Sequence, residues 1–157
     1  MQRRLFMAGL VGLAATACKK PAASQGLPAM LVHKSEGCAC CDGWVKHMRH
    51  AGFAVQVQEE SNMNDTKTRV GVPAGKGSCH TAEVGGYFIE GHVPAEDVQR
   101  LLVERPAGKG LVLPGMPLGS PGMEAPDGRV QPYTVELVLP SGDTVAFAQH
   151  GKPDQAA

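Results

Sequence analysis

Three cysteines within four residues, Cys38, Cys40 and Cys41, constrain the fold of this chain more than any other feature. The apolar run at residues 29–33 precedes them and suits a buried strand. The segment at 42–51 follows them, and its apolar side chains form one stripe at helical spacing. The thiols therefore lie where a strand feeds a helix. We expect the positive end of the helix dipole to favour their thiolate forms.

The remaining patterns extend this start into one small α/β unit. Gly85 and Gly86 form a two-residue hairpin signal, because both glycines tolerate positive φ. The stretch from Lys109 to Pro126 is dense in Gly, Pro and Met and has no periodicity, so we expect a loop packed by its own side chains. The elements predicted after the first helix are, in chain order, a strand at 53–57, a polar helix at 64–70, strands at 79–84 and 87–89, a helix opened by Pro94 and stopped by Pro106, and a terminal hairpin at 133–139 and 144–148.

This order resembles a thioredoxin fold, a mixed α/β sheet flanked by helices, with the Gly/Pro/Met loop and the C-terminal β-hairpin added to it. Two local patterns support the resemblance. Cys38 and Cys41 form a C-x-x-C pair at the start of the first helix. The segment Gly71-Val72-Pro73 precedes the third strand, where thioredoxins carry a cis-proline that faces the redox cysteines. Topology alone does not decide function.

The size and charge of the chain exclude some classes of function. Its 157 residues, 43% hydrophobic and 4% aromatic, support one domain with an aliphatic core and exclude a large multidomain enzyme. Fifteen basic and fifteen acidic residues give a net charge of zero, so nothing recruits nucleic acid by charge. We divide the chain into an export signal at 1–17, a linker at 18–28, a folded domain at 29–150 and a flexible tail at 151–157.

The N-terminus has the features of an export signal. Residues 5–17 are apolar, too short to span a bilayer, and end in Ala-Thr-Ala before Cys18. That ending fits a lipobox loosely and also suits the ordinary signal peptidase, while Arg3-Arg4 resembles a twin-arginine motif. All three routes lead out of the cytoplasm. We therefore expect a periplasmic protein, lipid-anchored at Cys18, with no other contact with the membrane.

The predicted topology brings further sulfur and nitrogen atoms to the cysteine loop. In a thioredoxin-like unit the third strand starts near that loop and the fourth returns to the same end, so Cys79 and His92 should converge on it. Met116 and Met123, in the loop after the last helix, can add thioethers to the same rim. His80 neighbours Cys79 on a strand, so its side chain should point to the opposite face.

These donor atoms favour Cu(I). Adjacent thiols such as Cys40 and Cys41 diverge and cannot easily surround one ion, whereas bridging thiolates hold several Cu(I) ions together. Soft sulfur ligands with accessory Met and His favour Cu(I) over harder metals. Zinc is the second choice among the metals. Zinc fingers use two C-x-x-C pairs, whereas here the later position offers a single cysteine, Cys79. The usual spacing of iron–sulfur ligands is absent.

Each of these residues also has a structural interpretation. A disulfide between Cys38 and Cys41, or from the loop to Cys79, is common in exported proteins. The two methionines can fill gaps under a long loop, and His92 can cap a helix or face solvent. For the other residues we expect core packing of Trp44, Met48 and Tyr87, surface positions for His47, His50 and His150, and a place close to the cysteine loop for His33.

Five motifs occur in order along the chain, at Cys38–Trp44, Gly71–Pro73, Ser78–Ala82, Glu90–Pro94 and Pro114–Glu124. Together they resemble the periplasmic CopG-type copper-resistance family, long catalogued as a domain of unknown function. The similarity spans about residues 29–125, and five motifs in order are far more specific than one C-x-x-C pair. The resemblance implies a thioredoxin-like fold, copper binding through the Cys-x-Cys-Cys loop and the later cysteine, and a role in copper tolerance.

The leading hypothesis is a periplasmic copper-resistance protein whose 29–150 domain holds Cu(I) at a multi-cysteine, polynuclear thiolate site and interconverts Cu(I) and Cu(II). Its expected partners are copper ions and other periplasmic copper-handling proteins. One alternative is a thiol–disulfide oxidoreductase of the cell envelope in which Cys38 attacks and Cys41 resolves. Another is a structural zinc or disulfide module that presents the Met-rich loop to a partner. The predicted copper ligands are Cys38, Cys40, Cys41 and Cys79, assisted by Met116, Met123 and His92.

Overall fold

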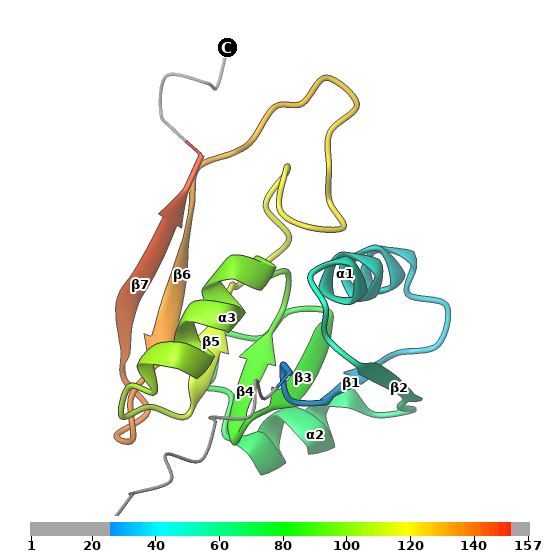
Figure 1. The fold of residues 1–157 in the computed structure, drawn as a ribbon. Helices are drawn as coiled ribbons and strands as arrows, with labels where there is room; N and C mark the ends of the chain where they lie inside the picture. The colour runs from blue at the N-terminus through cyan, green and yellow to red at the C-terminus, as the bar shows by residue number, and fades with distance from the viewer. Residues whose placement is uncertain (1–25, 152–157) are drawn as a thin grey trace, which may run out of the picture.

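The computed structural model describes residues 26–151, which form one seven-stranded sheet with three helices (Figure 1). The predicted export signal, Cys18, most of the predicted linker and the tail from residue 152 lie outside the described residues. Among the described residues, no helix is long and apolar enough to cross a membrane. The elements are β1 (Met30–Lys34), α1 (Ala39–His50), β2 (Val55–Glu59), α2 (Met63–Val70), β3 (His80–Val84), β4 (Tyr87–Glu90), α3 (Ala95–Glu104), β5 (Gly110–Val112), β6 (Tyr133–Val138) and β7 (Thr144–His150).

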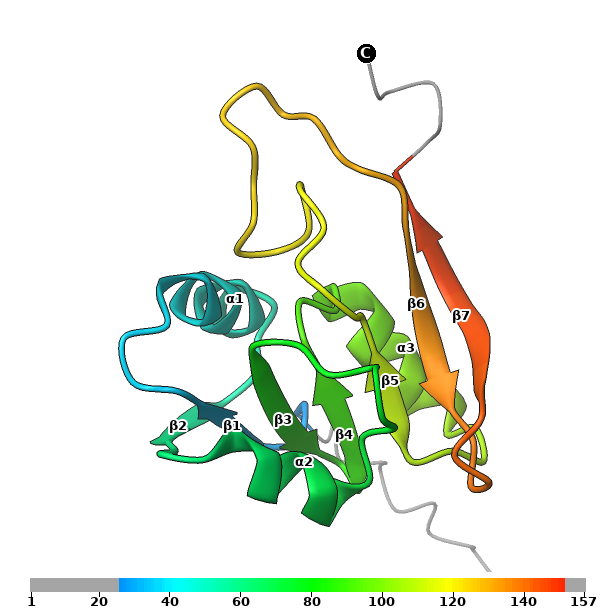
Figure 2. The same cartoon turned by 180° about the vertical axis from the view of Figure 1, so that it is seen from behind.

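The sheet is mixed, with strand order β2-β1-β3-β4-β5-β6-β7. The pairs β1–β2 and β4–β5 are parallel, and the other four pairs are antiparallel. Helices α1 and α3 cover one face and α2 covers the other, as the two opposite views show (Figures 1 and 2). The predicted α/β class and the element order from β1 to α3 are confirmed, and the arrangement is compatible with a thioredoxin-like unit.

The larger part of the core lies between the sheet and the two helices on the α1 and α3 side. Trp44 and Met48 of α1 are fully buried there, together with Val98 and Leu101 of α3. A smaller apolar cluster beneath α2 contains Phe88, and Val70 packs against it. The α1 side therefore supplies most of the hydrophobic stabilisation, which holds the start of α1 against the ends of the central strands. The predicted core positions of Trp44 and Met48 are confirmed.

The helix ends follow local sequence signals. Helix α2 is polar, yet the side chain of Asn62 accepts a hydrogen bond from the Asn64 N–H at 3.1 Å, and Gly71 closes the helix at φ 85°. Helix α1 begins at Ala39, three residues earlier than the sequence pattern indicated. Cys40 and Cys41 therefore lie in the first turn of the helix rather than in a loop before it.

The β3–β4 hairpin is confirmed. Gly85 and Gly86 adopt φ of 57° and 90°, the left-handed region that a two-residue hairpin turn requires. Val84 pairs with Tyr87 directly across the turn. This register places the N-terminal end of β3 beside the C-terminal end of β4.

The prediction of one continuous loop from Lys109 to Pro126 is wrong, because β5 lies inside it. All three residues of β5 are buried, and the strand pairs with both β4 and β6. A three-residue strand enclosed on both sides is too short to show a periodic pattern. The terminal hairpin of β6 and β7 is confirmed, and β5 joins it to the rest of the sheet.

The loop after β5 packs closely against the start of α1, and two glycines make the contact. A Cβ added to Gly122 would lie 2.6 Å from the Cys40 carbonyl oxygen and 2.7 Å from the Trp44 nitrogen. A Cβ added to Gly43 would lie 2.9 Å from the Gly122 Cα. Only glycine at both positions allows the loop to approach the cysteine end of the helix this closely.

We therefore expect Gly122→Ala to destabilise the fold by about 2 kcal/mol or more, because it combines a positive φ with a backbone clash. The matched control is Gly128→Ala, where φ is also positive at 74° but nothing lies within 4 Å of the added Cβ. That change should cost only about 1 kcal/mol. Urea unfolding followed by circular dichroism measures both losses. Equal losses would contradict the close packing described here.

Candidate metal centre

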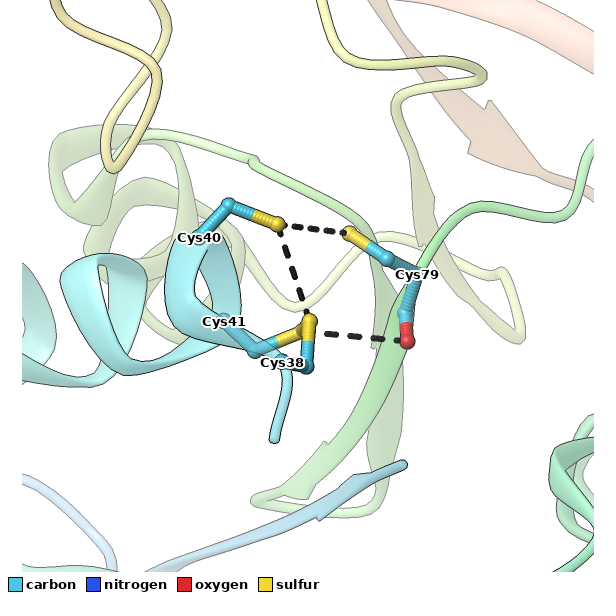
Figure 3. Close-up of side chains that lie close together, drawn as sticks. All are labelled: Cys38, Cys40, Cys41 and Cys79. Carbon is cyan, nitrogen blue, oxygen red and sulfur yellow. Dashed lines mark hydrogen bonds between the residues drawn. A yellow bond between two sulfur atoms is a disulfide. The ribbon is translucent and has the colours of Figure 1, made fainter. Parts of the chain in front are cut away.

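Four cysteines meet where the start of α1 faces the start of β3 (Figure 3). The Cys40 Sγ lies 3.6 Å from the Cys38 Sγ and 3.8 Å from the Cys79 Sγ. The Cys41 Sγ lies 3.8 Å from the carbonyl oxygen of Cys79. All four sulfur atoms are within 4.8 Å of one another. The structure thus brings together the two cysteine loci that are far apart in the sequence.

Cys38 and Cys41 are joined by a disulfide in this structure, whereas Cys40 and Cys79 are free thiols. This is one of the two disulfide pairings that the sequence left open. A disulfide sulfur lacks the negative charge of a thiolate, which is the form that binds metals. Cys38 and Cys41 can therefore act as ligands only after the disulfide is reduced.

His92 lies beside Cys79, with 2.9 Å between its Nε2 and the Cys79 Sγ. Its Nδ1–H donates to the Pro121 carbonyl oxygen at 2.8 Å, and burial lowers the pKa of the imidazole. The ring is thus neutral and carries its proton on Nδ1, so the lone pair of Nε2 faces the thiol. A backbone carbonyl behind an imidazole in this way is the usual orientation of a histidine metal ligand.

The expectation that His80 points away from the site is wrong. Its Nδ1 lies 3.7 Å from the Cys79 Sγ, and its ring is 5.0 Å from that of His92 and 4.4 Å from that of Trp44. Strand alternation failed as a guide because Cys79 precedes β3, which begins at His80. Burial is the main cause that lowers the pKa of His80 to about 3, so this imidazole is neutral.

Burial also controls the ionisation of Cys79. It raises the pKa of this thiol to about 11, and the neighbouring Cys40 adds to the rise. The expected preference for thiolates at the helix end therefore does not extend to Cys79, which is a neutral thiol at pH 7. A metal ion that binds its sulfur must displace the proton.

The two predicted thioether ligands, Met116 and Met123, differ in their position relative to the thiols. The Met116 Sδ lies 4.0 Å from the Cys40 Sγ, and this side chain is 51% exposed at the mouth of the site. The hydroxyl of Ser78 donates to the Gly115 carbonyl oxygen at 2.6 Å, which ties the Met116 loop to the residue before Cys79. Met123 is partly buried in the same loop, and among residues 26–151 no hydrogen bond joins its sulfur to the thiols.

The buried carboxylate of Glu90 supports the site from the opposite face of the sheet. It accepts hydrogen bonds from the Ser78 N–H at 2.6 Å and from the Thr81 hydroxyl at 2.7 Å, and it pairs with Lys67 of α2. These bonds hold the backbone on both sides of Cys79. The sequence gives no sign of this role, because only the fold brings Ser78, Thr81 and Lys67 to Glu90.

The remaining predicted histidines serve elsewhere. His33 contacts the carboxylates of Glu60 at 2.8 Å and Glu83 at 3.0 Å instead of the cysteine loop. His150 is not a simple surface residue, since its Nε2 lies 2.6 Å from the Asp97 carboxylate. Tyr87 lies in the core as expected. None of the peptide bonds of residues 26–151 is cis, so the bond before Pro73 is trans.

Replacing Glu90 by Gln should destabilise the protein by about 3 kcal/mol, because it leaves the ammonium group of Lys67 largely buried without a counter-charge. Adding Lys67→Met to Glu90→Gln should recover part of that loss, since no unpaired buried charge then remains. Urea unfolding of both variants and of Lys67→Met alone measures the coupling. A Glu90→Gln variant as stable as the wild type would show that the ion pair contributes little.

Comparisons with known proteins agree with this geometry. The family described as "Protein of unknown function, DUF411" matches residues 76–123. The solved structure titled "Copper resistance protein copG- Form 1" is 43% identical, covers 80% of this chain and 99% of its own, and has a TM-score of 0.75. The corresponding "Form 2" is 44% identical, covers 79% and 98%, and has a TM-score of 0.75. No curated protein matches. The chain therefore belongs to the CopG family of copper-resistance proteins.

Proposed function

We propose that this protein is a periplasmic copper-binding protein of copper resistance that holds Cu(I) at a multi-cysteine thiolate site. The observation that carries the proposal is the meeting of four cysteine sulfurs within 4.8 Å of one another. Family membership supports copper as the metal, because the matched structures are titled as copper resistance proteins. The ligands in this proposal are Cys38, Cys40, Cys41 and Cys79, with Met116, Met123 and His92 as assisting ligands.

The donor set suits several Cu(I) ions better than one ion of another metal. Thiolate and thioether sulfurs are soft ligands that select Cu(I). Cys40 and Cys41 are adjacent in the first turn of α1, and their sulfurs lie within 4.8 Å of each other and of the other two. Thiolates this close can bridge neighbouring Cu(I) ions. The methionine at the exposed mouth supplies a thioether where copper enters or leaves.

The Cys38 and Cys41 pair adds a redox capacity to the proposed site. When both are thiols, they can reduce two Cu(II) ions to Cu(I), forming one disulfide and releasing two protons. That step would produce the disulfide that joins Cys38 and Cys41 in this structure. A dithiol donor of the cell envelope would restore the thiols by disulfide exchange. In this way the protein would reduce Cu(II) to Cu(I) in repeated cycles.

The proposal includes the cellular place expected from the sequence. The apolar export signal directs the protein to the periplasm, where Cys18 anchors it to the membrane through lipid. An anchored domain with an exposed Met116 can exchange copper with other periplasmic copper-handling proteins.

The first test is an anaerobic Cu(I) titration of the reduced full chain against a competing chelator. We expect more than one Cu(I) per chain with thiolate-to-copper charge-transfer absorption in the ultraviolet, and a sharp loss of copper in Cys79→Ser. Cys18→Ser is the matched control, since this cysteine is not among the proposed ligands and its loss should leave the copper count unchanged. Retention of no copper by the reduced wild type would refute the proposal.

A second candidate function, thiol–disulfide exchange on exported proteins, is favoured by the C-x-x-C disulfide itself. The double variant Cys40→Ser, Cys79→Ser separates the two functions. A copper protein should lose most of its copper in this variant, whereas an oxidoreductase should keep full exchange activity through Cys38 and Cys41. Chelator competition and the rate of exchange with a small disulfide provide the two readouts, and Cys38→Ser, Cys41→Ser is the reciprocal control.

A further inference from the structure

A second group of donor atoms lies at the buried end of the thiol cluster. Cys79, His80 and His92 each offer one ligand atom, and these atoms lie within 4.8 Å of one another. Both histidines are fully buried, in contrast to the exposed Met116 at the other end of the site. The site therefore has a sulfur-rich mouth and a nitrogen-rich interior that share Cys79.

The spacing of this inner group fits a metal ion. Bonds of about 2.3 Å to sulfur and about 2.0 Å to nitrogen in a tetrahedral arrangement separate the two ligand atoms by about 3.5 Å. The Cys79 Sγ lies 3.7 Å from the Nδ1 of His80 and 2.9 Å from the Nε2 of His92. A shift of less than 1 Å in one side chain would bring both separations to the value that a bound ion needs.

His80 supplies an independent sign that this group has a ligand. Its Nε2 is buried and, alone among the buried side-chain nitrogen and oxygen atoms of residues 26–151, has no hydrogen-bond partner. Leaving such an atom unpaired destabilises the folded protein. Unsatisfied buried groups of this kind commonly mark a functional site or an ion. A metal ion bound at Nδ1 would leave this nitrogen unpaired, but the energy of the metal–nitrogen bond would offset the cost.

The chemistry of the inner group differs from that of the four cysteines. One thiolate with two neutral imidazoles is a donor set that copper proteins use to hold both Cu(I) and Cu(II). His92 is already fixed by Pro121 with its Nε2 lone pair toward Cys79. None of the three residues takes part in the Cys38–Cys41 disulfide.

We propose that Cys79, His80 and His92 form an inner copper site that stays competent when Cys38 and Cys41 are joined as a disulfide. The inference rests on the proposed function for the identity of the metal, and adds His80 as a ligand. Reduction and oxidation of the disulfide then change the number of copper ions held, and the oxidised protein keeps one. The oxidised protein is a copper-bound state rather than an empty one.

The test uses the full chain carrying Cys18→Ser, oxidised until thiol assay and mass show the Cys38–Cys41 disulfide and two free thiols. Anaerobic Cu(I) titration against a chelator should give one tightly held copper per chain. X-ray absorption should detect imidazole nitrogens bound to it, and the fluorescence of Trp44, the single tryptophan, should be quenched. A bound ion with only sulfur ligands, or no bound ion, would overturn the inference.

His80→Phe is the decisive variant, because it keeps a ring beside Trp44 but removes both nitrogens. In the oxidised protein it should weaken Cu(I) binding at least tenfold, with no such loss in His50→Phe, an exposed position on α1. Oxidised His80→Phe that binds as tightly as the wild type would overturn the inference. Should this variant fail to fold, the absorption spectrum of the oxidised wild type alone still decides between nitrogen and sulfur ligands.

The same series separates this inference from the proposed function. Reduced His80→Phe should still hold more than one Cu(I), because its four thiols are intact. Copper bound by the reduced wild type but absent from the oxidised wild type would defeat the inner site alone. Absence of copper from the reduced wild type would defeat the multi-thiolate proposal, whatever the oxidised protein binds.

Discussion

The antiparallel register of β3 and β4 is the constraint on which the site depends. The Gly85-Gly86 turn pairs Val84 with Tyr87, and the same register pairs Thr81 with Glu90. Continued past the strand ends, it sets Cys79 opposite His92. The 2.9 Å contact between their side chains therefore follows from a two-residue turn at the far end of the hairpin. A one-residue change in that turn would shift every pair in the register and separate the two groups.

The hairpin explains which parts of the site could be predicted from the sequence. The two glycines fixed the turn, so the convergence of Cys79 and His92 followed from the order of elements alone. The strand pattern misplaced His80 because alternation applies only within a strand, and Cys79 stands just outside one. Strand β5 and the role of Glu90 depend on tertiary neighbours, which no local pattern reports. Met116 and Met123 lie in a loop without periodicity. The sequence therefore could not tell which of the two sulfurs contacts Cys40, and in the structure it is that of Met116.

Burial divides the site into two environments. Met116 is exposed and Cys40, whose Sγ it contacts, is partly buried. His80 and His92 lie inside, and burial keeps both rings neutral, the state in which imidazole binds a metal. The same burial holds Cys79 protonated, so a metal ion that binds this sulfur must displace a proton. The metal affinity of the proposed inner site would therefore depend on how well the fold compensates the loss of that proton.

The buried ion pair beneath the sheet contributes to that compensation by fixing positions rather than by adding charge. Lys67 neutralises Glu90, so the pair presents little net field to the thiols above it. The carboxylate of Glu90 instead accepts hydrogen bonds from Ser78 and Thr81, the residues on either side of Cys79 and His80. A buried pair is seldom a source of net stability. Here it removes freedom from the segment that carries both donors, so less conformational entropy is lost when a metal binds.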